Sequence, residues 1–493
     1  MATTIERHGA SPGAEGFVYR GLREWLEAVD RLGQLRRVSG AGADEEIGAA
    51  TDVLQHTAES PAALFEQVPG YDPGFQVLVN SFGSTDRIAL TLGLPLGRSR
   101  VEVSEAWREK IRGLTPMPPE EVEDGPVFEN VLTGGDVDMT MFPTPKWHPL
   151  DGGRYIGTGS FDITRDPDDG WVNLGTYRVM VHDRVRLGYY ISPGKHGRIQ
   201  RQKYFDRGEP CPVAMVFGGD PLVFLASCTE IPYGVSEYEW VGAVRGEPVR
   251  VIRGPVTGLP IPADAEIVVE GYASSEEMLS EGPFGEWTGY YASASREEPV
   301  LKVEALYYRN DPILVGSPPG QPPDEQSRYR TILRSSLLRD ELEKAGIPDV
   351  VAAWQHEVGG SRLFTVVSIT QRYPGHSRQV LHVAAQCRAG AYAGRYTVVV
   401  DDDIDPSNLE EVIWALCTRS DPATSIDIIH RSWSTPLDPR IPPERKAARD
   451  FTNSRALIDA TRPWEWRDRF PVVNVPPHDA RQAATERWRH LLD

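Results

Sequence analysis

The chain has 493 residues, and its 52 Lys and Arg against 71 Asp and Glu give a formal net charge of −19. That length favours two or three domains. The acidic balance argues against nonspecific nucleic-acid binding and against an anionic membrane surface as a partner, although a local basic pocket could still hold an anion. No apolar run approaches the roughly 20 residues that cross a bilayer.

The four cysteines show neither CxxC spacing nor a neighbouring His cluster, which argues against a zinc ribbon or a disulfide framework. They are Cys211, Cys228, Cys387 and Cys417. The N-terminal sequence MATTIERHGASPGAEGF lacks the basic start and apolar core of a signal peptide. We therefore expect a cytoplasmic protein.

Residues 1–125 are predicted to form an N-terminal α/β segment. A helix is expected within 21–38, where apolar residues recur at helical spacing and Gly33 suits the end. The residues on that face are Leu22, Trp25, Leu26, Val29 and Leu32. A second helix is expected over 44–58 and a strand over 75–82. The Pro- and acid-rich stretch 115–126 predicts a domain boundary.

Residues 126–318 read mostly as short strands separated by turn residues, which favours a barrel or a strongly bent sheet. The expected strands lie in 155–164, 172–183, 186–192, 211–219, 249–254, 265–273 and 300–309.

The rest of the chain alternates helices and strands. A linking helix is expected within 319–347, over 322–346, with Gly346 as its C-cap. Residues 348–465 are predicted to form an α/β domain with strands at 363–370 and 396–403 and helices at 377–389 and 407–419. A capping box of Ser407 and Glu410 would open the last of these helices. Residues 466–493 are predicted as a tail helix suited to packing on a partner subunit.

Several familiar site motifs are absent. The acid run DDDID at 401–405 lacks the spacing of an EF-hand loop and is interpreted as a strand-to-helix turn. The chain has no GxSxG elbow, no P-loop and no GxGxxG after a strand, so ATP, NAD and serine-hydrolase chemistry have no local support.

Asn173, His196 and Glu237 offer a carbonyl oxygen, an imidazole nitrogen and a carboxylate, a mixed set that suits a divalent ion such as Mn²⁺. His196 is expected on a Gly-rich turn. Asn173 and Arg178 are five apart, which would split them between the faces of a regular strand, and Gly175 between them could host a bulge. Each residue also has a plain structural reading, as a backbone-bonded Asn, a loop His or a solvated Glu.

The sequence EGPFGEWTGYY at 281–291 places Glu281 and Glu286 five positions apart around a Gly-Pro-Phe-Gly break. Such a spacing points to opposite faces of a strand and about 140° apart on a helix. Either the break folds both carboxylates toward one site, or this is a surface turn with two solvated acids. With Arg178, the pair could tune and orient a proton donor, or form a structural ion pair.

In order and spacing, several of these segments resemble the UbiD family of reversible decarboxylases that use prenylated FMN. The resemblance rests on EGPFGEWTGYY, VNLGTYRVMVHD, SPGKHG and SEYEWVGAVRGEPVRV and covers about residues 20–465. It implies an α/β multidomain fold: an N-terminal segment, a split β-barrel cofactor domain like that of flavin reductases, a linking helix and a C-terminal α/β domain that dimerises. A homodimer, or a homohexamer built as a trimer of dimers, is therefore expected.

The resemblance also implies residue roles. Asn173, His196 and Glu237 would hold Mn²⁺ or a similar divalent ion against the flavin phosphate, with K⁺ nearby. Glu239 lies two positions beyond Glu237, but the Ser-Glu-Tyr context favours Glu237. Thr158, Lys195 and Arg178 are expected to contact the cofactor.

The catalytic residues implied are Arg178, Glu281 and Glu286, which match a Glu-Arg-Glu network. Arg178 would bind the substrate carboxylate, Glu286 would protonate the carbon left after CO₂ departs, and Glu281 would hold Arg178. The expected reaction is reversible decarboxylation of an aromatic or heteroaromatic acid through a covalent adduct with prenylated FMN, which a flavin prenyltransferase would supply. Alternatives are the same chemistry on an α,β-unsaturated acid, a flavin reductase, and a non-catalytic scaffold subunit.

Overall fold

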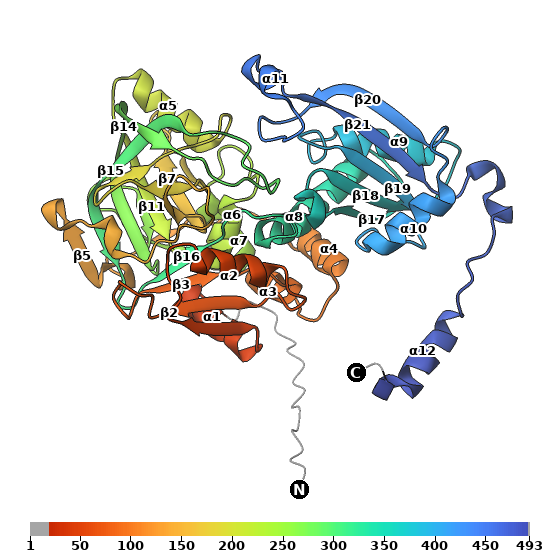
Figure 1. The fold of residues 1–493 in the computed structure, drawn as a ribbon, viewed down its shortest axis with the longest axis horizontal. Coiled ribbons are helices and arrows are strands. Elements are labelled where there is room, and N and C mark those ends of the chain that lie inside the picture. The colour runs from red at the N-terminus through yellow and green to blue at the C-terminus, as the bar shows by residue number, and fades with distance from the viewer. Residues whose placement is uncertain (1–18, 492–493) are drawn as a thin grey trace, which may run out of the picture.

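A computed structural model describes residues 19–491, which form four β-sheets with helices packed on and between them (Figure 1). Residues 1–18 of the predicted N-terminal segment and residues 492–493 of the predicted tail helix lie outside the described residues. Short 3₁₀ turns also occur, namely η1 (Pro126–Phe128), η2 (Gly134–Asp136), η3 (Met139–Met141), η4 (Glu357–Gly359), η5 (Trp464–Arg469) and η6 (Arg489–Leu491).

The N-terminal sheet has the strand order β1-β2-β3-β16 and is completed by a strand from more than 200 residues later in the chain. Its strands are β1 (Leu35–Ser39), β2 (Ala62–Glu66), β3 (Gln76–Val79) and β16 (Ile313–Gly316). The accompanying helices are α1 (Leu22–Arg31), α2 (Glu46–Gln55), α3 (Thr85–Leu92) and α4 (Arg100–Lys110). As expected, α1 buries Leu22, Trp25, Leu26 and Val29, but Leu32 lies beyond the helix and is 38% exposed.

The middle of the chain forms a nine-stranded sheet in the order β6-β9-β10-β15-β14-β11-β7-β8, with β5 paired to β15. Its strands are β5 (Asn130–Thr133), β6 (Arg154–Gly157), β7 (Ser160–Arg165), β8 (Val172–Gly175), β9 (Val179–Val181), β10 (Arg186–Gly188), β11 (Cys211–Phe217), β14 (Ile267–Glu281) and β15 (Arg296–Tyr308). The expected split-barrel fold class is confirmed.

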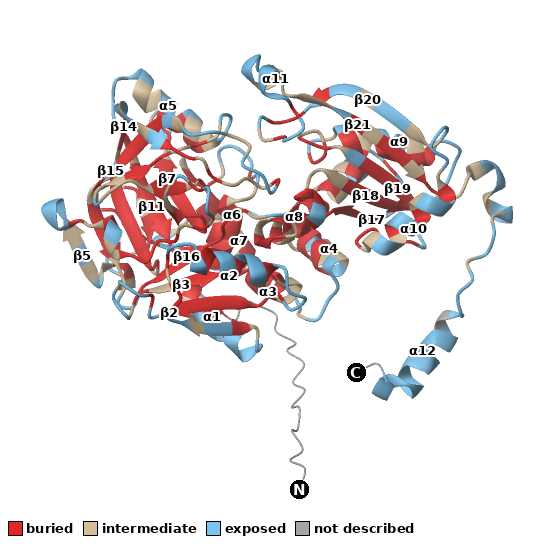
Figure 2. Cartoon of the chain, viewed as in Figure 1, coloured by how far each residue is buried: buried red, intermediate tan, exposed pale blue. Residues whose placement is uncertain are grey.

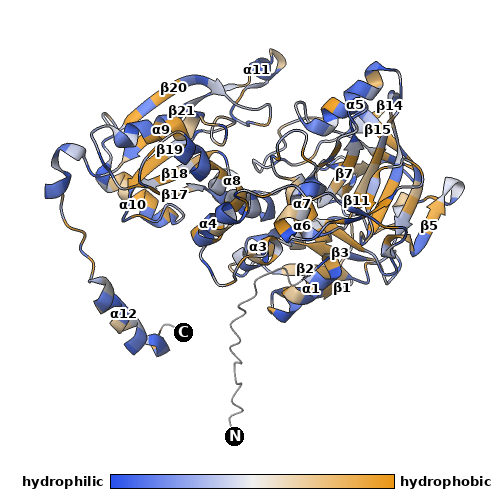
Figure 3. Cartoon of the chain, turned by 180° about the vertical axis from the view of Figure 1, so that it is seen from behind, coloured by the Kyte–Doolittle hydropathy of each residue, from blue (hydrophilic) through white to orange (hydrophobic). Residues whose placement is uncertain are grey.

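This sheet is buried on both faces, because successive residues of its inner strands point into two different hydrophobic clusters. In β11, Val213 and Met215 pack in one cluster, whereas Ala214 and Val216 pack in the other. Hydrophobic residues are concentrated in the strands (Figure 3). The helices of this region are α5 (His196–Asp206), α6 (Pro221–Ser227) and α7 (Glu237–Arg245). A small separate sheet consists of β4 (Glu120–Glu121), β12 (Arg250–Arg253) and β13 (Pro260–Pro262), in the strand order β13-β12-β4.

The long helix α8 (Glu325–Lys344) leads to a five-stranded sheet in the order β17-β18-β19-β21-β20. Its strands are β17 (Val350–Gln355), β18 (Phe364–Ile369), β19 (Tyr396–Asp401), β20 (Ile426–Trp433) and β21 (Thr452–Ala460), and its helices are α9 (His376–Gln386), α10 (Leu409–Arg419) and α11 (Pro443–Ala447). In the tail, the helix α12 occupies only His478–Arg487. Between residues 19 and 491, no helix has both the length and the apolar character needed to cross a membrane.

The acid run at 401–405 is a strand-to-helix turn, as predicted, because β19 ends at Asp401 and α10 begins eight residues later. Arg419 donates to Asp401 and Asp403 at 2.9 and 2.8 Å, so these carboxylates have a cationic partner within the fold. The predicted capping box of Ser407 and Glu410 is wrong.

The helix begins one residue later than that box requires. The Ser407 hydroxyl bonds Asp405 at 2.8 Å, and Asn408 caps the helix by accepting from the N–H of Glu410 at 3.1 Å.

Candidate active site

Arg178 lies between two carboxylates. Its Nε and Nη2 donate to Oε1 and Oε2 of Glu281, each at 2.8 Å, and its Nη1 donates to Oε1 of Glu286 at 2.9 Å. The bond to Glu281 is bidentate, which fixes the orientation of the guanidinium plane. The structure therefore brings together all three residues predicted to form the Glu-Arg-Glu network, and neither glutamate is a solvated surface acid.

The chain break between the two glutamates makes this meeting possible. The strand β14 ends at Glu281, and Gly282 follows with a φ of +82°, a left-handed conformation that favours glycine. Beyond the break, the Glu286 N–H bonds the Tyr290 carbonyl at 3.1 Å and its carbonyl accepts from Gly289 N–H at 2.8 Å. The turn aims Glu286 back at the arginine that Glu281 already binds.

Aromatic rings pack around the Arg178 network. Tyr155 donates its hydroxyl to Glu281 Oε1 at 3.0 Å, and its ring lies 3.9 Å from that of Phe284 between centroids. The Arg178 guanidinium carbon lies 4.7 Å from the Tyr190 ring centroid. Glu281 is only 1% exposed. A charge pair in such a setting interacts more strongly than one in water.

The protonation states follow from this setting. Burial raises the pKa of Glu286, and the neighbouring Arg178 and Arg296 only partly oppose that effect. Burial disfavours the charge on Arg178, but its hydrogen bonds to Glu281 and the charges of Glu281 and Glu286 outweigh burial and raise the pKa of Arg178. The site thus combines a permanent cation, able to hold an anion, with a carboxyl group that keeps its proton to a higher pH than usual.

Asn173 and Arg178 lie on opposite sides of a strand break. The strand β8 ends at Gly175 and its register with β7 runs without a shift, so the predicted bulge at Gly175 is wrong. Arg178 precedes β9, which pairs with a different strand, β6. The change of strand, and not a bulge, separates the two side chains.

His196 and Glu237 are the first residues of α5 and α7, and both helices pack against β8. The prediction that His196 lies on a turn is therefore wrong, although the SPGKHG turn leads directly into α5. Glu237 Oε2 accepts a hydrogen bond from Leu174 N–H, next to Asn173, at 2.6 Å. The His196 ring lies 5.0 Å from that of Trp171, two residues before Asn173.

The chemistry of this set fits a divalent cation. The Asn173 amide nitrogen is buried without a hydrogen-bond partner, and burial raises the pKa of Glu237 to about 8, which the bond from Leu174 only partly opposes. Partial burial, with Lys195 beside it, lowers the pKa of His196, so its imidazole is neutral at pH 7. Within residues 19–491, no cluster of three His, Cys, Asp or Glu side chains could hold a metal, and this set has two such residues plus an amide.

The two remaining residues predicted to contact the cofactor are Thr158 and Lys195. The Thr158 hydroxyl accepts from Ser317 N–H at 3.0 Å, at the end of β16. Lys195 is the N-cap residue of α5 and its side chain is exposed. In the described part of the chain, no hydrogen bond or ion pair joins either residue to the other predicted site residues.

A basic cluster around Glu230 was not anticipated from the sequence. Burial opposes ionisation of Glu230, yet the pKa of its carboxyl is lowered because Arg334, Arg362 and Lys195 lie near it. The guanidinium carbon of Arg362 lies 5.9 Å from the ring centroid of Trp287, the neighbour of Glu286. These cations come from distant segments, so only the tertiary structure reveals this local positive charge in an acidic protein.

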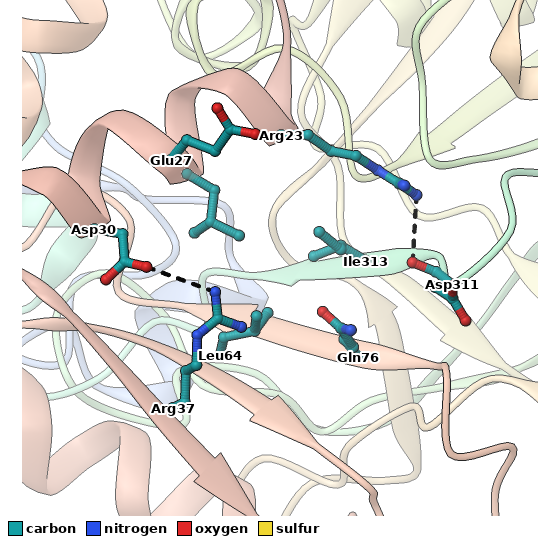
Figure 4. A pocket seen from close by; sticks show the side chains of 9 residues that line it. Arg23, Glu27, Asp30, Arg37, Leu64, Gln76, Asp311 and Ile313 are labelled. Carbon is teal, nitrogen blue, oxygen red and sulfur yellow. Dashed lines mark hydrogen bonds and ion pairs between the residues drawn. The ribbon is translucent and has the colours of Figure 1, made fainter.

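Two surface pockets lie away from these residues. One lies between α1 and the N-terminal sheet, where Arg37 pairs with Asp30 and Arg23 donates to the backbone carbonyl of Asp311 (Figure 4). The other lies on the C-terminal sheet around Arg395, Arg445 and Asn453. Neither contains a predicted site residue.

Models of three domains described for 3-octaprenyl-4-hydroxybenzoate carboxy-lyase match this chain. They are the UbiD N-terminal domain at 26–107, the Rift-related domain at 120–322 and the C-terminal domain at 329–460. The chain belongs to the UbiD family. It is thus a member of a carboxy-lyase family, and the resemblance noted in the sequence is confirmed.

Individual UbiD-family relatives match over nearly the whole chain. Pyrrole-2-carboxylic acid decarboxylase of Pseudomonas aeruginosa is 32% identical over 95% of this chain and 97% of its own. The structure of vanillic acid decarboxylase of Sedimentibacter hydroxybenzoicus in open form covers 97% of this chain and 100% of its own, with a TM-score of 0.85 and 30% identity. An evolved dimeric form of HmfF from Pelotomaculum thermopropionicum in complex with prFMN covers 94% and 98%, with a TM-score of 0.79 and 27% identity.

Proposed function

We propose that this UbiD-family protein reversibly decarboxylates an aromatic or heteroaromatic carboxylic acid with prenylated FMN as its cofactor. The observation that carries this proposal is the buried arginine bound by two glutamates, Arg178 with Glu281 and Glu286. One of these carboxyls has a raised pKa, as a proton donor at neutral pH requires.

In the proposed reaction, Arg178 binds the carboxylate of the substrate and orients it. Loss of CO₂ leaves an electron pair on the ring carbon, and Glu286 donates its proton to that carbon, leaving a carboxylate that solvent reprotonates. Glu281 keeps Arg178 charged and correctly oriented through the bidentate bond. In the carboxylation direction, Glu286 would take the proton back.

When CO₂ leaves an sp² carbon, no group within the substrate can accept the electron pair that remains. Bound prenylated FMN supplies such an acceptor. Asn173, His196 and Glu237 would hold Mn²⁺ or a similar divalent ion together with the flavin phosphate. K⁺ nearby is part of the same proposal. Lys195, Arg362 and the other cations around Glu230 add a positive local field for anionic ligands.

The substrate class is proposed from the relatives, which include decarboxylases named for pyrrole-2-carboxylic acid and for phenolic acids. The same residues would also serve an α,β-unsaturated acid, since Arg178 recognises only the carboxylate.

We further propose a homodimer, with a homohexamer as the larger alternative, assembled through the C-terminal domain. The edge strand β20 leaves Ile428 and Trp433 52% and 63% exposed. The described side chains of α12 are exposed, and this helix extends away from the rest of the chain (Figure 2). An isolated helix this short is marginal in water, so a partner surface would stabilise it.

The deciding experiment expresses the chain with and without a flavin prenyltransferase. We expect a modified flavin spectrum and CO₂ release only after co-expression, and Mn²⁺ bound to the flavin-loaded protein. A panel of benzoic, pyrrole-type and cinnamic acids then separates the aromatic from the unsaturated class. Equal CO₂ release without the prenyltransferase would overturn the proposal, and light scattering of the same samples measures the oligomeric state.

A further inference from the structure

The Tyr177 side chain fills a space that exists because Gly175 and Gly197 have no Cβ atom. A Cβ atom at Gly175 would lie 2.1 Å from the Tyr177 hydroxyl oxygen, and one at Gly197 would lie 2.6 Å from it. Both distances are far below van der Waals contact, so any larger residue at either position would displace the phenol. The side chain is 8% exposed. The end of β8 and the start of α5 therefore close around this one hydroxyl.

The hydroxyl is bonded to the helix that begins with His196. Gly197 N–H, which lies in the first turn of α5 and has no intrahelical acceptor, donates to Tyr177 Oη at 3.2 Å. The phenol thus caps the first turn of α5 from the side of β8. A movement of this helix start relative to the strand would break the bond.

The phenol is also close to the strand that carries Asn173, because it lies against Gly175. Burial raises the pKa of Tyr177, the Asp162 and Glu237 carboxyls raise it further, and the hydrogen bond from Gly197 N–H lowers it. One buried hydroxyl therefore lies between Gly175, two residues after Asn173, and Gly197, the neighbour of His196.

The phenolic proton has no hydrogen-bond acceptor among the described residues, since Tyr177 only accepts from Gly197. Nearby, the Asn173 amide nitrogen lacks a partner, and so do both oxygens of Asp162, whose residue pairs with Gly175 across the sheet. Unpartnered buried polar atoms this close together are costly unless another group completes them. A cation that attracts the Asn173 oxygen would turn its amide nitrogen toward an acceptor, for which the Tyr177 oxygen is available.

We propose that Tyr177 is a positioning residue for the divalent-ion site. Its hydroxyl fixes the distance between β8, which carries Asn173, and the first turn of α5, which begins with His196. That distance sets the separation of the two ligands of the ion. This inference rests on the proposed function, because it takes Asn173, His196 and Glu237 as the ligands. Tyr177 itself does not contact the ion or the reacting atoms.

The test compares two substitutions that each remove a single buried hydroxyl, Tyr177→Phe and Tyr189→Phe. Tyr189 is fully buried in the same sheet region, and its hydroxyl has no hydrogen-bond partner, so it is a matched control. Metal-free wild-type and variant proteins are titrated with Mn²⁺ in the presence of saturating FMN. Free Mn²⁺ is measured by electron paramagnetic resonance, and the unfolding midpoint of each metal-free protein is recorded.

We expect Tyr177→Phe to weaken Mn²⁺ binding by about 10- to 100-fold, the range typical of residues that orient metal ligands. Tyr189→Phe should bind Mn²⁺ like the wild type. Equal binding by wild type and Tyr177→Phe would overturn the role of Tyr177 and leave the proposed function intact. Failure of the wild type to bind Mn²⁺ would instead overturn the proposed ion site, and the role of Tyr177 with it.

A second variant covers the case in which Tyr177→Phe does not fold. Gly197→Ala keeps the hydroxyl but introduces the Cβ atom that would displace it. We expect this variant to lose Mn²⁺ affinity by a similar factor. Wild-type affinity in Gly197→Ala would show that the phenol need not sit between the two glycines, and would overturn the proposal.

Discussion

Two clusters can be compared: the Arg178 network (Arg178, Glu281 and Glu286) and the Asn173 set (Asn173, His196 and Glu237). They differ in how many of their polar groups have hydrogen-bond partners within the protein. Arg178 has both carboxylates at hydrogen-bond distance, and Glu281 receives three hydrogen bonds from protein groups. In the Asn173 set, by contrast, the amide nitrogen of Asn173 has no partner within residues 19–491, and the only donor to Glu237 there is a backbone N–H. The first cluster is satisfied by its own fold, whereas in the second a buried carboxyl has no cationic partner among the described residues.

This difference teaches which interactions belong to folding and which to ligand binding. A buried ion pair leaves an uncompensated charge when one partner is removed, so the Arg178 network should matter to stability as well as to chemistry. Because the buried carboxylate of the Asn173 set has no cationic partner in the described part of the chain, substitutions in this set should change the unfolding free energy of the metal-free protein little. They should weaken ion binding strongly.

The largest effect is expected from Glu286→Gln, which removes the transferable proton but keeps the size of the side chain. Turnover should fall by about 10²- to 10⁴-fold, the usual contribution of a general acid. Bound flavin should be retained, because the ion set is untouched. CO₂ release and deuterium exchange into the product measure the loss.

Glu277→Gln is the control, since Glu277 pairs with Arg186 at 3.2 Å on an exposed part of β14. Turnover of Glu286→Gln within a factor of two of the wild type would rule out Glu286 as the proton donor.

Arg178→Met tests the stability side of the comparison. It leaves Glu281 buried at 1% exposure without its cation, which should cost about 3–5 kcal/mol of unfolding free energy. The measurement is the denaturant midpoint of the metal-free protein. An unchanged midpoint would show that the network contributes nothing to folding and would remove the contrast between the two clusters.

His196→Ala tests the binding side. The metal-free variant should lose about 1 kcal/mol of unfolding free energy or less, because His196 is only half-buried. Its Mn²⁺ content after purification should fall by at least about tenfold together with flavin retention. His148→Ala, at a half-buried histidine outside the site, serves as the control. Normal Mn²⁺ content in His196→Ala would contradict its role as a ligand.

The smallest effect is expected in the pH dependence of stability. Because burial raises the pKa of Glu286 in the folded state, the native protein binds this proton more tightly than the unfolded chain. The stabilisation is complete below the unfolded pKa of about 4.3 and is lost as pH rises through the folded value. The Gln side chain of Glu286→Gln cannot ionise, so this variant should gain stability relative to the wild type as pH rises through that window.

Thermal unfolding of the wild type and of Glu286→Gln at several pH values would reveal this difference. If Glu286→Gln instead loses stability relative to the wild type as pH rises, Arg178 outweighs burial at Glu286.

The sequence by itself determined the residue types of the site and the larger elements that have clear periodicity. The helix expected over 322–346 is α8, and the strand-rich middle is the nine-stranded sheet. These predictions hold because apolar spacing and Gly or Pro punctuation act locally. Motif order also indicated the UbiD family.

The tertiary structure decided everything that depends on long-range contacts. Spacing left a surface turn and a shared site as alternatives for Glu281 and Glu286, and only the position of Arg178, more than 100 residues earlier, decides between them. The helices beginning at His196 and Glu237 were not predicted from the sequence and become visible through their packing on β8. Tyr177 could not have been found from the sequence, because its role comes from the space left by Gly197 on another element.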